Sequence, residues 1–152
     1  MKCMFDTNIF NDILDGKINI NTFKENITCY ATNVQYDEIN KTSETTRRDK
    51  LNAVFSSLDT TRLATETCCF DISRLDTDKL GDGVLYTEIK EFMDKLNKKK
   101  KNNERDALIA ETSIQNKLTL VTHDKELYKA VTEFRGSAVN LYYILTDSYR
   151  DI

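Results

Sequence analysis

The pattern of apolar and polar positions at the N-terminus predicts a short strand that passes directly into a helix. Residues 2–5 form an apolar run, and apolar side chains return between Ile9 and Leu14 at the spacing of one helix face. The predicted helix begins at Thr7, so Asp6 stands where the strand gives way to the helix. A carboxylate at this step is either the N-cap of the helix or part of a functional site.

The succession of strand and helix is then repeated. Residues 27–31 are rich in β-forming side chains and predict a second strand, and Thr32 or Asn33 is suited to cap a helix after it. Residues 43–58 and 84–96 carry apolar side chains at helical spacing and predict two further helices. The region between those two helices shows no regular pattern of apolar positions.

The C-terminal part of the chain shows the same succession again. A helix predicted from Glu104 ends near Asn116, and residues 118–122 have the strongest strand pattern in the chain. Another helix follows and is predicted to close with Gly136 at the C′ position. Residues 137–145 predict a last strand.

This alternation predicts an α/β fold, a three-layer α/β/α sandwich around a central parallel sheet of four to five strands, because parallel neighbours need crossovers and crossovers are usually helical. The length of 152 residues predicts a single domain over 1–152, with 43–101 as a helical insertion or clamp within it. Ligands of such sheets bind at the carboxyl ends of the strands.

Composition narrows the class of protein. With 39% hydrophobic and 31% charged residues, the chain is expected to be an ordinary soluble globular protein. No apolar run approaches the roughly 18 residues of a membrane-spanning helix, and the first residues lack the pattern of a signal peptide. We therefore expect a cytoplasmic protein with no membrane partner.

Cysteine and histidine usage argues against several kinds of chemistry. The four cysteines lack the paired spacing of a zinc site and the density of a disulfide scaffold. The adjacent pair Cys68 and Cys69 could be redox-active, but burial in an apolar stretch is the favoured interpretation. His123 is the only histidine, so a histidine-oriented nucleophile has little support. Any chemistry is expected to rest on carboxylates and a metal.

Four acidic residues are placed so that they could meet at one edge of the sheet. Asp6 and Asp124 follow predicted strands, Glu38 lies early in the helix after the second strand, and Asp106 opens the helix that leads to the third. Each alone could be a cap or a solvated helix residue. Together they would repel one another, and a divalent cation such as Mg²⁺ or Mn²⁺ would remove that penalty. Such a site suits hydrolysis of phosphodiesters.

The segments around these acids resemble a known family. "FDTNIF" at 5–10, "VQYDEI" at 34–39, "ERDALIA" at 104–110 and "LVTHDKEL" at 120–127 are similar to the four acidic motifs of the PIN-domain ribonucleases, the fold of the VapC-type toxins. The resemblance implies a parallel α/β/α sandwich and Mg²⁺- or Mn²⁺-dependent endoribonuclease activity on RNA. It also implies, as partners, a small antitoxin and a second copy of the chain in a homodimer.

Carried over position by position, the resemblance assigns the catalytic and metal-binding acids to Asp6, Glu38, Asp106 and Asp124. Glu38 is preferred to Asp37 because an aliphatic residue, Ile39, follows it. Asn8 and Thr122 match supporting positions beside the first and fourth acids, and His123 is read as a surface residue. The chain departs from the family at Glu111 and Thr112, where alanines are common, and residues 59–101 match no motif.

The implied mechanism uses Asp6, Asp106 and either Glu38 or Asp124 to hold one or two metal ions. Water activated at the metal would attack the phosphorus in line and leave a 5′-phosphate and a 3′-hydroxyl. The net charge is −3, but basic residues gather just ahead of Asp106. The residues expected to contact the RNA phosphates are Lys98, Lys99, Lys100, Lys101 and Arg105.

Two other functions agree with parts of the pattern. The same fold could be a non-catalytic RNA- or protein-binding module in which the four carboxylates are helix caps. A phosphoryl-accepting receiver domain also places aspartates at the ends of parallel strands. It requires an acidic pair near the N-terminus, which this sequence lacks, so we rank it last.

Overall fold

The computed structural model describes residues 1–145, and the last seven positions of the predicted domain, 146–152, lie outside the described residues. A single sheet of five parallel strands runs through its centre in the order β3-β2-β1-β4-β5. The strands are β1 (Lys2–Phe5), β2 (Thr28–Thr32), β3 (Thr61–Leu63), β4 (Thr119–Val121) and β5 (Ser137–Val139). The predicted α/β class and parallel sheet are confirmed.

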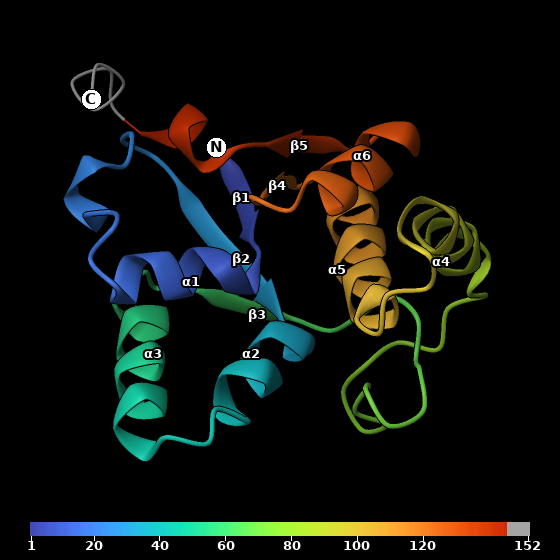
Figure 1. Cartoon of the computed structure of the whole chain (residues 1–152), viewed down its shortest axis with the longest axis horizontal. Coiled ribbons are helices and arrows are strands. Elements are labelled where there is room, and N and C mark those ends of the chain that lie inside the picture. Colours follow the sequence, from blue (N-terminus) through green and yellow to red (C-terminus); the bar gives the residue numbers. More distant parts are fainter. Residues whose placement is uncertain (146–152) are drawn as a thin grey trace.

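Helices cover both sides of the sheet (Figure 1). One group comprises α1 (Thr7–Leu14), α2 (Asn33–Asn40) and α3 (Thr45–Ser57), and the other comprises α4 (Val84–Asn97), α5 (Asn103–Gln115) and α6 (Lys125–Glu133). None of the helices described is both long enough and apolar enough to cross a membrane. The predicted layers of helix, sheet and helix are therefore present.

The central strand β1 is buried on both faces of the sheet. Cys3, Met4 and Phe5 are fully buried, and their side chains alternate between the two cores as strand geometry requires. Cys3 and Phe5 pack among residues of the α1 and α3 side, whereas Met4 packs among residues of α4, α5 and α6. A continuous apolar run is what a strand with two covered faces needs.

The sequence showed no regular pattern between residues 59 and 82, and a strand in this region was missed. Thr61–Leu63 forms β3 and pairs in parallel with β2, with Thr61 opposite Tyr30. The strand is three residues long and lies at the sheet edge, where Thr61 and Arg62 are exposed, so it carries no apolar pattern. The predicted insertion 43–101 therefore contains a strand of the main sheet and is not wholly helical.

The last predicted strand is shorter than expected. Instead of running over 137–145, β5 stops at Val139, and a 3₁₀-helix follows at Leu141–Ile144. Asn140 ends the strand because its side-chain oxygen accepts a hydrogen bond from the backbone N–H of Tyr142 at 3.2 Å. The apolar residues that suggested a longer strand are buried from this short helix instead.

Gly136 has a different role from the one predicted. The residue with left-handed backbone after α6 is Arg135, at φ 61°. Gly136 is needed for space, since a Cβ there would lie 2.6 Å from Cγ1 of Ile114 and 2.7 Å from Cγ1 of Val131. The glycine lets the chain pass close to α5 before β5 begins.

The cysteines divide into two pairs. Cys3 and Cys29 are buried on neighbouring strands, and burial raises the pKa of the Cys3 thiol to about 11 and that of Cys29 to about 12. Both are therefore unreactive core residues. Cys68 and Cys69 are free thiols and only half-buried, which corrects the expectation that this pair is buried.

Candidate active site

Asp6 lies at the carboxyl end of β1 and receives three hydrogen bonds. Its Oδ1 accepts from the backbone N–H of Thr7 at 2.7 Å, which caps α1. Its Oδ2 accepts from Nδ2 of Asn8 at 2.7 Å and from Oγ1 of Thr122 at 2.6 Å. Asn8 and Thr122, the two predicted supporting residues, thus hold one oxygen of this buried carboxylate between them.

Strand register explains why residues so distant in sequence meet here. β1 pairs with β4 so that Phe5 lies opposite Val121, and the backbone N–H of Asp6 continues the ladder by donating to the carbonyl of Val121 at 3.0 Å. Asp6 and Thr122 each follow one member of this pair. Parallel strands end at the same edge, so both side chains emerge there.

Glu38 reaches the same edge from α2. Its Oε2 accepts a hydrogen bond from Oγ1 of Thr7 at 2.5 Å, and its Oε1 lies 3.6 Å from Nη1 of Arg105. Asp37 is turned away, because its carboxylate is paired with the guanidinium of Arg74, whose Nε lies 3.3 Å from Oδ2. The geometry therefore places Glu38 and not Asp37 among the acids at the edge.

Gln35 sets the position of α2. Thr32 and Gln35 form a capping box at the start of the helix, in which Oε1 of Gln35 accepts from the backbone N–H of Thr32 at 2.6 Å. Nε2 of Gln35 also donates to the carbonyl of Phe5 at 3.0 Å. This buried side chain ties the first turn of α2 to the end of β1, and Glu38 lies on the same helix face three residues later.

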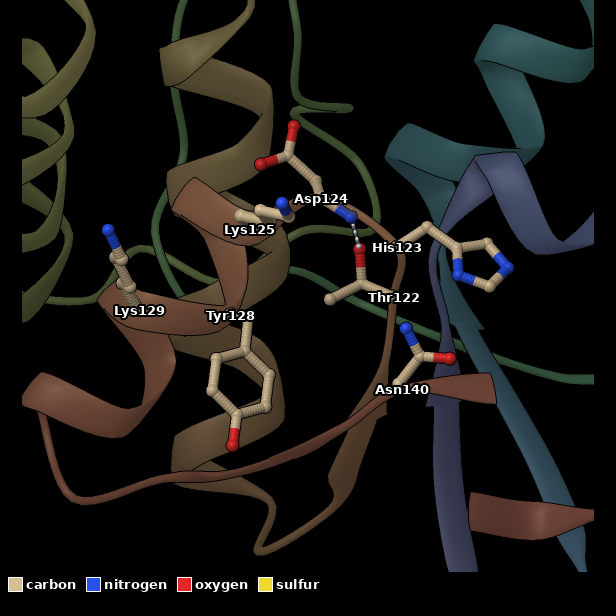
Figure 2. A pocket seen from close by; sticks show the side chains of 7 residues that line it. All are labelled: Thr122, His123, Asp124, Lys125, Tyr128, Lys129 and Asn140. Atoms are coloured by element: carbon tan, nitrogen blue, oxygen red, sulfur yellow. Dashed lines mark hydrogen bonds between the residues drawn. The ribbon is translucent and has the colours of Figure 1, made fainter. Parts of the chain in front are cut away.

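Asp124 caps α6 and lies next to Asp6 through Thr122. Its Oδ1 accepts from the backbone N–H groups of Glu126 at 2.8 Å and Leu127 at 3.0 Å. Its own N–H donates to Oγ1 of Thr122 at 3.0 Å (Figure 2). Its Oδ2 lies 3.3 Å from Nζ of Lys100. Oδ1 of Asp124 therefore caps the helix, whereas Oδ2 faces the ammonium group of Lys100.

Asp106 lies in the first turn of α5, and within residues 1–145 no hydrogen bond reaches its carboxylate. Burial raises its pKa to about 7, and the charges of Asp6, Asp124 and Glu38 add to the increase. All four carboxylates therefore lie close enough to act on one another electrostatically. Their roles in catalysis stay predictions.

Asp6 and Asp124 respond differently to this setting. Burial raises the pKa of Asp6 to about 6, although the hydrogen bonds from Thr122 and Thr7 oppose the increase. Burial also acts to raise the pKa of Asp124, but the backbone N–H groups of its cap and the charge of Lys100 outweigh it and hold the pKa below its usual value. Asp124 is thus ionised, whereas Asp6 and Asp106 resist ionisation.

The basic connection between α4 and α5 turns only part of its charge toward the acids. Lys100 and Arg105 pair with Asp124 and Glu38. Lys98, Lys99 and Lys101 are exposed and form no ion pair within the described residues. The predicted RNA contacts therefore divide into two residues at the acidic cluster and three on the neighbouring surface.

The donor set fits a hard divalent cation in kind. All four acidic side chains offer oxygen, and Asp6 is buried while the other three are partly exposed. Among residues 1–145, no three His, Cys, Asp or Glu side chains are already gathered closely enough to hold a metal ion. Mg²⁺ usually takes one or two carboxylates and completes its shell with water and phosphate oxygens. Two of the four acids would be sufficient for such a site.

Two contributors to the site were missed from the sequence. Thr7 orients Glu38, and Gln35 fixes α2; the Thr-x-x-Gln spacing of a capping box could have revealed the latter. His123, interpreted from the sequence as a surface residue, is partly exposed. Its Nε2 lies 3.2 Å from Oδ2 of Asp12, and its ring packs against Tyr142 with centroids 6.2 Å apart.

A five-stranded parallel sheet with four carboxylates at its carboxyl edge defines an α/β protein with an acidic site at the strand ends. The chain belongs to the PIN-domain family, because the PIN domain family model matches residues 3–132. No curated protein sequence shows a significant match.

Two solved structures illustrate the similarity in fold. VapBC2 from Rickettsia felis, bound to a DNA fragment from its promoter, shares 20% identity with a TM-score of 0.56, over 92% of this chain and 98% of that one. VapBC-1 from nontypeable Haemophilus influenzae shares 16% identity with a TM-score of 0.60, over the same shares of the two chains, 92% and 98%. At these identities the likeness shows a common fold.

Proposed function

We propose that the protein is an Mg²⁺- or Mn²⁺-dependent endoribonuclease and the toxin of a toxin–antitoxin pair. The observation that carries this proposal is the gathering of Asp6, Glu38, Asp106 and Asp124 at one sheet edge, with the pKa of Asp6 and of Asp106 raised by burial and mutual repulsion. Buried carboxylates that repel one another are a costly arrangement without a cation. Membership of the PIN-domain family supports the nuclease chemistry.

Asp6 and Asp106 are the side chains that would hold the metal. A divalent cation at this place supplies a lowered pKa for water and neutralises charge on the phosphate. Asn8 and Thr122 fix the orientation of Asp6, because both donate to its Oδ2. Of the remaining acids, either Glu38 or Asp124 accepts the proton that the attacking water loses.

The basic residues serve the RNA backbone. Lys100 and Arg105 pair with Asp124 and Glu38, so both cations lie where the phosphates of an RNA strand above the acids would approach. Lys98, Lys99 and Lys101 extend the positive surface beyond the acids, where phosphates flanking the cut would lie. The products would carry a 5′-phosphate and a 3′-hydroxyl.

The proposal includes a partner and a cellular place. The VapBC structures of similar fold are toxin–antitoxin proteins, and we infer a small antitoxin partner for this chain on that basis, together with a homodimer. Residues 1–152 are proposed to act as one PIN-like domain with 43–101 as its clamp. We propose that the protein acts on cellular RNA in the cytoplasm.

The test is cleavage of purified RNA by the wild-type chain in Mg²⁺ or Mn²⁺, compared with EDTA. Asp106→Asn and Asp6→Asn are expected to reduce cleavage at least about 100-fold, the scale seen when a group that stabilises the transition state is removed. Asp37→Asn is the matched control, since Asp37 neighbours Glu38 but pairs with Arg74. Cleavage that persists in EDTA and in both site variants would refute the proposal.

One observation favours a second candidate, a non-catalytic RNA- or protein-binding module. Lys100 and Arg105 already neutralise Asp124 and Glu38 in part, as the charges of a passive surface would. In that case Mg²⁺ would not change the binding of RNA or protein. Neither wild type nor any variant of the four acids would cleave RNA.

A further inference from the structure

A hollow of about 220 Å³ lies beside the acidic cluster and has no role in the mechanism described above. One side is formed by Lys125, Tyr128 and Lys129 of α6, and the other by Thr122 after β4 and Asn140 after β5 (Figure 2). It therefore opens at the same carboxyl edge of the sheet as the four acids.

The hollow is adjacent to the acids without being part of them. Asp124 and Thr122 line it and also belong to the acidic cluster. In Figure 2 the carboxylate of Asp124 points away from the ring of Tyr128. An RNA strand whose scissile phosphate lies over the acids would therefore bring a neighbouring nucleotide to the hollow.

The lining offers the contacts that an unpaired base requires. Tyr128 is 42% exposed, so its ring is available as a stacking surface. The side-chain oxygen of Asn140 is taken by the backbone N–H of Tyr142, and within the described residues its Nδ2 donates to nothing. That Nδ2 is therefore left to donate to a base edge. Aromatic stacking combined with a few polar contacts is the usual way in which proteins hold unpaired bases.

Two unpaired ammonium groups border the same hollow. Lys125 and Lys129 are exposed, and neither forms an ion pair with any residue between 1 and 145. They lie one helical turn apart on α6, so both reach the same face. Positive charge beside an aromatic ring fits a phosphate attached to a stacked base and does not fit a purely apolar ligand.

We propose that this hollow is a nucleotide subsite, which binds one unpaired base of an RNA strand on Tyr128, next to the cleaved phosphate. Asn140 donates to the base edge, and Lys125 and Lys129 contact the adjoining phosphates. The volume is below the roughly 300–1,000 Å³ of ordinary ligand pockets, which suits a single ring system. The inference rests on the proposed nuclease function and restricts its substrate to single-stranded RNA.

Binding of a fluorescently labelled ten-nucleotide oligouridine, measured by anisotropy in EDTA and low salt, tests the subsite without cleavage. Tyr128→Leu is expected to weaken binding by about 5- to 150-fold, the range that base–aromatic stacking supplies. Tyr128→Phe keeps the ring and is expected to bind like wild type. A 2-aminopurine base placed within the strand should lose fluorescence on binding to wild type and to Tyr128→Phe, but not to Tyr128→Leu.

The lysines are tested with a matched control. Lys129→Gln is expected to weaken binding and to reduce its dependence on salt, whereas Lys2→Gln, at the start of β1 and so at the opposite edge of the sheet, should change neither. Equal affinity for a duplex of the same length would contradict the proposal.

The outcomes separate this inference from the proposed function. Metal-dependent cleavage by a chain whose Tyr128→Leu variant binds like wild type would refute the subsite alone. Stacking on Tyr128 without any metal-dependent cleavage would refute the nuclease and leave a single-strand binding site. Failure of wild type to bind the oligouridine would overturn the subsite.

Discussion

The hydroxyl of Thr122 donates a 2.6 Å hydrogen bond to Oδ2 of Asp6 across 116 positions of sequence. Oγ1 of Thr122 in turn accepts a hydrogen bond from the backbone N–H of Asp124 at 3.0 Å. Thr122 thus uses its hydroxyl in both directions and connects two acids that belong to different strands. Neither acid can shift without disturbing the other.

Thr122→Val removes this connection while keeping the shape of the side chain. We expect the free energy of unfolding to fall by about 1–3 kcal/mol, because a hydrogen bond to a buried charged group is lost. The pKa of Asp6 should rise further, since the Thr122 hydroxyl holds it down. Urea unfolding measures the first effect, and carboxyl NMR titration measures the second.

Thr119→Val is the control for that substitution. Its hydroxyl lies on the same strand and contacts Oγ of Ser137 at 3.1 Å on an exposed surface. Its loss should cost less than about 0.5 kcal/mol, as surface substitutions usually do. Equal losses in the two variants would mean that the hydrogen bond from Thr122 to Asp6 stabilises the fold no more than a surface contact does.

The stability of the metal-free protein should fall as the pH rises. The pKa is about 6 for Asp6 and about 7 for Asp106 in the folded chain, against 3.8 when each is unperturbed. Between about pH 4 and pH 7 the folded state therefore binds more protons than the unfolded state, so raising the pH favours unfolding. The expected loss is of the order of a few kcal/mol, measured by urea unfolding in EDTA at pH 4.5 and 7.5.

Asp106→Asn should flatten that pH dependence and raise stability at pH 7.5. No hydrogen bond from residues 1–145 reaches the Asp106 carboxylate, so neutralising it removes repulsion and breaks no contact. Asp37→Asn, which breaks the pair with Arg74, should leave the slope between pH 4.5 and 7.5 unchanged. An unaltered slope in Asp106→Asn would contradict the assignment of the raised pKa.

Asp6→Asn is expected to behave differently. Its Oδ2 accepts from both Asn8 and Thr122, and an amide nitrogen in that place would face two donors. The relief of repulsion is therefore offset by about 1–3 kcal/mol of lost hydrogen bonding. Thermal unfolding in EDTA should find Asp106→Asn the more stable of the two, and the reverse order would count against this geometry.

Addition of Mg²⁺ should raise the melting temperature of wild type, because a ligand that binds only the folded state stabilises it by mass action. At 100 times the dissociation constant the gain is about 2.7 kcal/mol at 25 °C. The gain should be lost in Asp106→Asn and kept in Asp37→Asn. An equal response of all three proteins would place the cation elsewhere.

Gly136→Ala should destabilise the fold by about 1–3 kcal/mol, the cost of overpacking. The added methyl would lie 2.6 Å from Ile114 and 2.7 Å from Val131. Gly16→Ala serves as comparison, since its backbone is left-handed at φ 71° but nothing lies within 4 Å of the added Cβ. Its cost should be limited to backbone strain of about 1 kcal/mol, and urea unfolding compares the two variants.

Local sequence was sufficient for the elements that carry a strong pattern. β1 over residues 2–5 and α1 over residues 7–14 have the predicted bounds, because a run buried on both faces and an amphipathic face are visible in single segments. The two edge strands of the sheet were not predicted correctly. β3 was missed and β5 was overextended, since a three-residue strand at a sheet edge owes its existence to a neighbour and not to its own pattern.

For the candidate site, the sequence by itself determined which acids follow strands and which open helices, because caps and strand ends are local features. Only the tertiary structure decided that Glu38 faces the cluster while Asp37 faces Arg74, and that Lys100 lies at Asp124. These contacts depend on the register of strands and the angles of helices far apart in the chain. Side-chain direction across such distances is set by packing, which no single segment encodes.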